Sequence, residues 1–255
     1  MPLSAHSCVT SSSSISQSLS ERLAQIHARI VQATHLAGRA TQTVQLIAVS
    51  KTISADVITM AHAAGQSSFG ENYVQEGIKK IQNLNELRDK LVWHFIGPVQ
   101  SNKTALIAEH FDWVHSIDRL KIAQRLSTQR PSHLPPLQVC IQVNMSGEKS
   151  KSGVAPAELY PLAMQIATLK NIRLRGLMTL PEASKVPQRT PFAQLRALYN
   201  ACNQIFSTQG IPLMDTLSMG MSADFEEAIL EGATMVRVGS AIFGSRSPAP
   251  QSSST

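Results

Sequence analysis

The chain has 255 residues, of which 43% are hydrophobic and 16% are charged, and its formal net charge is +6. These proportions are typical of a folded globular chain, and no apolar run approaches the roughly 20 residues that a membrane-spanning helix needs. The basic residues are scattered from Arg22 to Arg246 without a long run, which favours a solvated surface over a nucleic-acid interface. Three widely spaced cysteines, Cys8, Cys140 and Cys202, argue against a disulfide framework or a zinc site and indicate a reducing compartment.

Both ends of the chain are rich in serine. The first 20 residues contain nine serines and no Lys, Arg, Asp or Glu, so we predict that residues 1–17 form a flexible extension. A transit peptide would carry arginines and a secretory signal would need a longer apolar segment, so we expect a cytoplasmic protein. Residues 247–255 are predicted to form a flexible tail, which leaves residues 18–246 as one folded domain.

The folded domain begins with a predicted helix. Ser18 and Glu21 have the spacing of a capping box, and apolar residues then recur on one helical face from Leu23 to Ile30. Gly38 provides a stop signal. We therefore expect a helix before the first strand.

Eight short apolar segments follow, separated by segments with helical patterns. Strict alternation of this kind indicates a parallel sheet, and eight repeats indicate closure into a (β/α)8 barrel of the TIM type. An open, doubly wound sheet is the alternative if a strand is miscounted. The expected strands are 44–49, 67–70, 92–96, 113–116, 139–143, 172–177, 214–218 and 234–238. The expected helices include 56–64, 103–110, 119–127, 156–169, 192–206 and 222–230.

Polar residues lie at or just beyond the carboxyl ends of the expected strands, the face on which barrels of this type build their active sites. In chain order they include Lys51, Asn72, Gln100, His115, Asn144, Thr179, Ser218 and Arg237. This arrangement predicts a ligand site at the mouth of the barrel.

The turns after the seventh and eighth strands are the usual phosphate-binding positions of such a barrel. The segment from Ser218 to Ser222 and the pair Gly239 and Ser240 offer small residues, serine and glycine, whose backbone amides can approach an anion. We expect Ser222 to cap the helix that follows. A single turn of this kind commonly serves only as a helix cap, but two at these positions favour a phosphate site.

Lys51 and Arg237 give the site its chemistry. A lysine at the end of a strand commonly reaches only solvent, but a desolvated lysine amine can condense with an aldehyde. A lysine, a phosphate cradle and a fixed cation at Arg237 together match the requirements of pyridoxal phosphate. A cofactor-free aldolase that binds a sugar phosphate is an alternative for the same residues.

Several sequence blocks resemble one known family. In order along roughly residues 20–246 they are AVSKT (48–52), FGENYVQE (69–76), HFIG (94–97), QSNK (100–103), SKSG (150–153), LSMGMS (217–222), VRVG (236–239) and IFG (242–244). Together they resemble the pyridoxal phosphate homeostasis proteins, small single-domain relatives of the alanine racemase barrel.

The resemblance assigns roles to individual residues. It implies that Lys51 holds pyridoxal 5'-phosphate as a covalent aldimine and that Arg237 faces the pyridine nitrogen. Ser218, Gly239 and Ser240 match the positions that hold the phosphate. Asn72 matches a polar position near the cofactor.

The expected function is that of a carrier. An arginine at the pyridine nitrogen leaves that nitrogen unprotonated, which makes the ring a poorer electron sink. Racemases obtain a second acid or base from an additional domain, for which we expect no room here. We therefore expect a protein that buffers the cofactor and delivers it to apo-enzymes, without catalysis and without nucleic-acid or membrane partners.

The alternative is a weak amino-acid racemase. His94 and His115 would be its candidate bases, although a histidine near an apolar strand is more often a hydrogen-bonded structural residue. Tyr73 lies next to Asn72 and could either contact the cofactor or pack against the fold.

Overall fold

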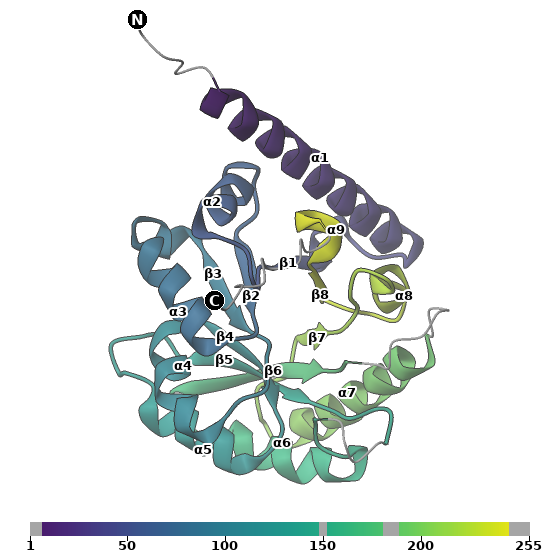
Figure 1. The fold of residues 1–255 in the computed structure, drawn as a ribbon. Coiled ribbons are helices and arrows are strands. Elements are labelled where there is room, and N and C mark those ends of the chain that lie inside the picture. The colour runs from purple at the N-terminus through teal and green to yellow at the C-terminus, as the bar shows by residue number, and fades with distance from the viewer. Residues whose placement is uncertain (1–6, 148–151, 181–188, 245–255) are drawn as a thin grey trace, which may run out of the picture.

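A computed structural model describes residues 7–147, 152–180 and 189–244, with side chains from Leu19 onward. In these residues eight parallel strands close into a barrel in sequence order, and β8 pairs with β1 (Figure 1). The closure confirms the (β/α)8 barrel and excludes the open sheet. The strands are β1 (Gln45–Val49), β2 (Ser68–Glu71), β3 (Val92–Phe95), β4 (Trp113–Ile117), β5 (Leu137–Gln142), β6 (Ile172–Met178), β7 (Thr216–Ser218) and β8 (Met235–Val238).

Helices surround the barrel and cover the outer face of the sheet (Figure 1). They are α1 (Ser7–Leu36), α2 (Ala55–Ala63), α3 (Val74–Asn83), α4 (Thr104–His110), α5 (Leu120–Gln129), α6 (Leu159–Ala167), α7 (Thr190–Thr208), α8 (Phe225–Leu230) and α9 (Ser240–Phe243). Short 3-10 helices cover Thr41–Thr43, Asn85–Lys90, Ser101–Lys103 and Pro156–Glu158. No helix among these residues has the length and apolar character needed to cross a bilayer.

Helix α1 precedes the barrel, as expected, but it begins at Ser7 instead of Ser18. Its apolar face from Leu19 to Ala33 is buried. Once that face is packed, each further residue extends the helix without the cost of nucleation, so the serine-rich segment can continue it. The flexibility of residues 1–17 stays a prediction. Residues 1–6, the tail 247–255 and part of the SKSG block lie outside the described residues.

Strand β7 is shorter than expected because the backbone of Met214 bonds to α7 instead of a neighbouring strand. Its amide donates to Asn203 Oδ1 at 2.9 Å, and its carbonyl accepts from Tyr199 Oη at 2.6 Å. The strand therefore begins at Thr216.

The expected cap at Ser222 is wrong. Helix α8 begins at Phe225, with Asp224 at the N-cap position. Asp224 Oδ1 accepts a hydrogen bond of 2.6 Å from the Met221 amide, which holds residues 221–224 in a turn before the helix. Ser222 is consequently free to face the mouth of the barrel.

The interior of the barrel has an apolar and a polar part. Because alternate residues of a strand face the same side, Met235 and Arg237 of β8 both point inward, as do Trp113 and His115 of β4. The apolar part is a separate buried cluster made of Ile47, Trp113, Cys140, Met178 and Met235. The polar part lies between this cluster and the mouth, and it supports the site described next.

Candidate functional site

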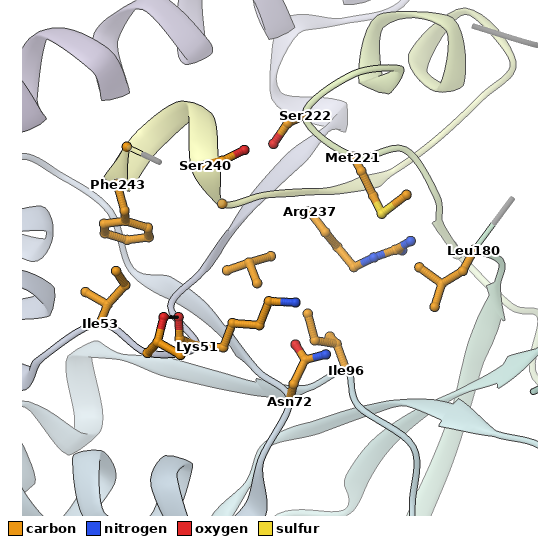
Figure 2. A pocket seen from close by; sticks show the side chains of 14 residues that line it. Lys51, Ile53, Asn72, Ile96, Leu180, Met221, Ser222, Arg237, Ser240 and Phe243 are labelled. Atoms are coloured by element: carbon orange, nitrogen blue, oxygen red, sulfur yellow. Dashed lines mark hydrogen bonds between the residues drawn. The ribbon is translucent and has the colours of Figure 1, made fainter. Parts of the chain in front are cut away.

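A cavity of about 390 Å³ opens at the carboxyl ends of the strands (Figure 2). This volume lies within the range of small-molecule sites. Of the six predicted site residues, five line the cavity: Lys51, Asn72, Arg237, Gly239 and Ser240. The other lining residues are Val49, Thr52, Ile53, Ile96, Leu180, Met221, Ser222, Phe243 and Gly244.

Lys51 lies two residues after the end of β1, and its side chain extends into the cavity (Figure 2). Within the described part of the chain, its Nζ makes no hydrogen bond or ion pair. Because most partly buried ammonium groups are paired, an unpaired amine facing a cavity is available to a ligand.

Arg237 lies on β8 and is only 3% exposed. Its Nη1 donates to Ser218 Oγ at 2.6 Å and its Nη2 donates to the Thr179 carbonyl at 2.9 Å. Burial lowers the pKa of the guanidinium to about 10, so it stays charged at neutral pH. Among the described residues no carboxylate forms an ion pair with it. The cavity wall thus contains a fixed cation that only neutral acceptors satisfy.

Ser218 is the predicted site residue that does not line the cavity. Its side chain is fully buried, and its Oγ contacts Arg237 and His115 Nδ1, the latter at 2.8 Å. The hydroxyl therefore faces the barrel interior, and this geometry does not support the expected phosphate contact. Instead, Ser218 accepts a hydrogen bond from the guanidinium of Arg237 on the side of the barrel interior.

His94 and His115 extend this polar chain into the barrel. His115 Nε2 lies 2.9 Å from His94 Nδ1. Because Arg237 donates to Ser218, the serine hydroxyl can donate to His115, and His115 can then donate to His94. The remaining hydrogen sits on His94 Nε2, which is buried without a partner among the described groups.

Both histidines are neutral at physiological pH. Burial lowers the pKa of His94 to about 3. Burial, with the neighbouring His94 and Arg237, lowers the pKa of His115 well below its usual value. Neither residue is part of the described cavity wall, and both are hydrogen-bonded groups of the barrel interior.

The turns after β7 and β8 form one side of the cavity. Gly220 adopts a positive φ of 91°, and its carbonyl accepts from the Arg237 amide at 3.0 Å. A side chain at Gly220 would collide with Ala228, because its Cβ would lie 2.6 Å from the Cβ of that residue. The hydroxyls of Ser222 and Ser240 face each other across this side of the cavity (Figure 2).

Asn72 follows β2 and contributes a carboxamide to the wall. Its Oδ1 is buried and has no hydrogen-bond partner among the described groups. Tyr73, in contrast, is 60% exposed and is not among the lining residues. Asn72 is therefore the residue of this pair that can contact a ligand.

Sequence reasoning placed Ser222 in the segment expected to bind phosphate, and this residue does line the cavity, but it missed most of the apolar part of the wall. Ile53, Ile96, Leu180, Met221 and Phe243 contribute that part. Each of these residues follows a strand within a few residues or lies in the helix after that strand, so its position along the chain could have indicated that it lines the cavity. Their apolar character made them resemble core residues.

Comparison with known proteins places the chain in a family. The family model described as "Alanine racemase, N-terminal domain" matches residues 22–247. The "Pyridoxal phosphate homeostasis protein" of Pseudomonas aeruginosa is 56% identical over 230 residues, which are 89% of this chain and 96% of that protein. The protein of the same name from Escherichia coli K12 is 51% identical over 231 residues, 89% of this chain and 97% of that protein.

Solved structures agree with these relatives. PipY of Synechococcus elongatus, solved with PLP bound, is 38% identical and superposes with a TM-score of 0.76 over 89% of this chain and 100% of that chain. An alanine racemase of Clostridium difficile, at 15% identity and a TM-score of 0.67, covers 92% of this chain and 58% of its own length, and shows the fold alone. The predicted resemblance is confirmed, and the chain belongs to the family of pyridoxal phosphate homeostasis proteins on the alanine racemase N-terminal barrel.

Proposed function

We propose that the cavity binds pyridoxal 5'-phosphate, that Lys51 holds it covalently and reversibly, and that the chain serves as a cytoplasmic carrier that delivers the cofactor to apo-enzymes. The observation that carries this proposal is the pairing, in one cavity, of an unpartnered lysine amine with a buried arginine that has no carboxylate partner among the described residues. The names of the relatives and the PLP-bound structure of PipY support the same ligand.

The residues of the cavity fit the separate parts of this ligand. The Lys51 amine suits the aldehyde, and the N–H groups of Arg237 suit the pyridine nitrogen, which is an acceptor. The hydroxyls of Ser222 and Ser240, with the turn at Gly239, suit the phosphate. The unpartnered Asn72 Oδ1 supplies a polar contact, and Ile96 and Met221 supply apolar contacts for the ring.

When bound, the cofactor supplies an aldehyde that condenses with a primary amine to form an imine, with loss of one water molecule. Lys51 provides the amine, and the surrounding wall orients it. Arg237 donates a hydrogen bond without giving up its proton, because a guanidinium stays charged at neutral pH. Ser240 is exposed, so the phosphate side of the cavity opens toward solvent and allows release.

The wall favours holding the cofactor over catalysis. Among the described lining residues, Lys51 and Arg237 are the only ionisable side chains. A racemase needs a second group that can exchange a proton with the substrate. Amino acids labelled with deuterium at the α-carbon test this point: retention of the label supports the carrier, and loss with inversion of configuration supports a weak racemase.

The covalent assignment is tested on the purified full chain with added pyridoxal phosphate. We expect a yellow protein that borohydride reduces to a pyridoxyl group on Lys51, located by peptide mass mapping. Lys51→Ala should abolish the adduct, because no other lysine lines the described cavity. Lys121→Ala, at an exposed position of α5, is the matched control and should label like the wild type.

Two results would contradict the assignment. An adduct that persists at another lysine in Lys51→Ala would move the covalent site. A colourless protein that takes up no pyridoxal phosphate would exclude the proposed ligand and favour the cofactor-free aldolase. Delivery is tested separately by mixing the loaded chain with a pyridoxal phosphate-dependent apo-enzyme in the presence of an excess of a trap for free cofactor. The apo-enzyme should gain activity faster with the loaded chain than with the same amount of free pyridoxal phosphate.

A further inference from the structure

The turn that carries Lys51 has an unusual backbone. Thr52, the next residue, has a φ of 67°, in the left-handed region. This conformation is unfavourable for a β-branched residue, so it persists only where surrounding groups hold it. The orientation of Lys51 depends on this turn, because its Nζ has no partner in the described part of the chain.

The turn lies between two cavities, so packing surrounds it only in part. Thr52 and Ile53 line the cavity on one side and also line a second cavity of about 360 Å³ on the other. Glu76 and Lys80 of helix α3 line this second cavity too. Ile53 also packs against the main core, but because the turn borders two open spaces, its polar contacts contribute to holding it.

Those contacts are hydrogen bonds from side chains of α3 to the peptide groups on both sides of Lys51. Lys80 Nζ donates to the Ser50 carbonyl at 2.6 Å. Glu76 Oε1 accepts from the Thr52 amide at 2.5 Å. The Ser50 carbonyl also accepts from the Ile53 amide at 2.9 Å, so Lys80 reinforces a hydrogen bond that closes the turn.

The two side chains are themselves fixed. Lys80 is buried, and its Nζ also contacts Glu71 Oε1 at 2.8 Å and Glu76 Oε1 at 2.6 Å. All three hydrogens of its ammonium group thus have acceptors. Glu71 in turn accepts from Ser50 Oγ at 2.6 Å, so β2, α3 and the Lys51 turn form one network.

Helix α3 can reach this position because Gly77 lies between Glu76 and Lys80. A Cβ on Gly77 would lie 2.7 Å from Phe111 Cζ and 3.3 Å from Glu71 Cβ. The absence of a side chain lets the helix approach β2 closely. Glu76 and Lys80, four residues apart, then face the turn together.

We infer that Glu76 and Lys80 are positioning residues that fix the Lys51 backbone, and thereby the direction from which its amine meets an aldehyde. The inference rests on the proposed role of Lys51 and deepens it. Neither residue lines the cofactor cavity, so both act through the turn. Loss of these hydrogen bonds lets Thr52 relax from its unfavourable backbone conformation and moves the amine of Lys51.

The test compares covalent and non-covalent binding in the full chain. The rate of adduct formation on Lys51 with pyridoxal phosphate is followed by absorbance. The affinity for deoxypyridoxine phosphate, which has a methyl group in place of the aldehyde, is measured by calorimetry. We expect Glu76→Ala to slow adduct formation roughly tenfold or more, because misplacement of a reacting group by about 1 Å has effects of this size. The affinity for the analogue should change less than twofold.

Matched variants separate positioning from general damage. Glu76→Gln keeps an oxygen that can accept from Thr52, so we expect it to restore most of the rate. Lys80→Met should slow adduct formation as Glu76→Ala does. Glu86→Ala and Lys79→Met change exposed residues of the same types and should match the wild type.

The outcomes distinguish this inference from the proposed function. If the wild type forms no adduct on Lys51, the proposed function itself fails. If the wild type forms the adduct and Glu76→Ala reacts as fast as Glu86→Ala, only the positioning role fails. A parallel loss of analogue affinity in Glu76→Ala would also overturn it, because the cavity as a whole would then have changed. Glu76→Ala keeps the buried contact between Lys80 and Glu71, so it provides the test even if Lys80→Met does not fold.

Discussion

At the scale of single residues, the charge of Arg237 is held by neutral partners. Ser218 and the Thr179 carbonyl accept its hydrogen bonds, and His115 stands behind Ser218. A carboxylate in the same place would compete with a ligand for the guanidinium. Neutral acceptors fix its direction and leave its charge available to the cavity.

Ser218→Ala tests this arrangement. The change removes the acceptor of Arg237 Nη1 and leaves His115 Nδ1 unpaired, so we expect a loss of about 1 to 3 kcal/mol in the free energy of unfolding. We also expect weaker binding of pyridoxal phosphate, because the guanidinium is less well oriented. Urea unfolding and cofactor titration measure the two effects. Ser207→Ala, at an exposed position of α7, is the control, and equal behaviour of the two variants would refute the role of Ser218.

At the scale of elements, helix α1 completes the side of the barrel that carries the turn at Gly239 and Ser240. It packs on α8 and α9, beside the closure of β1 with β8 (Figure 1). Arg29 forms an ion pair with Glu226 and lies over the ring of Phe225, 4.6 Å from its centroid. Since α9 begins with Ser240, α1 supports a residue of the cavity wall through its packing on α9.

Ile26→Ala tests how much α1 contributes to the fold. Ile26 is 3% exposed and belongs to the main core, so truncation leaves a cavity that the neighbours fill only in part. We expect a loss of about 2 to 4 kcal/mol in the free energy of unfolding, measured with denaturant. Gln25→Ala, one position away on the exposed side, should change it by less than about 0.5 kcal/mol. Similar values for both variants would mean that α1 does not dock in solution as described.

At the scale of the whole molecule, the buried histidines couple stability to pH. Both take up protons more readily in the unfolded chain, where a histidine has its ordinary pKa near 6.5. The pKa of His94 falls to about 3 in the fold and that of His115 is also lowered. The stability that the two neutral histidines contribute is therefore fully present above about pH 6.5. This contribution is lost progressively as the pH falls below that value, because the unfolded chain then binds more protons than the folded chain.

We expect His94 alone to reduce the free energy of unfolding by about 2 kcal/mol between pH 7 and pH 5, with a further loss from His115. Urea unfolding at the two pH values measures the sum. NMR titration assigns the loss to individual histidines, and the His94 ring should show no titration between pH 8 and pH 5. A His94 midpoint near 6.5 would show that the ring is solvated, contrary to the described interior.

The sequence by itself determined the features that depend on local patterns. Short apolar segments separated by helical periodicity predicted the eight strands and the barrel, because strand and helix periods are local properties. Lys51 and Asn72, which lie just after β1 and β2, were found by position, since parallel strands bring their carboxyl ends to one face. The turn at Gly239 and Ser240 was found in the same way.

The tertiary structure decided the features that depend on closure and register. His115 meets Ser218 across 103 residues and His94 across 21, and Lys80 reaches the Ser50 carbonyl across 30. Whether Ser218 faces the cavity or the barrel interior depends on the strand register, because a shift of one residue reverses the side to which the side chain points. No local pattern encodes these contacts. They form only when the barrel closes and buries polar groups that must then satisfy one another.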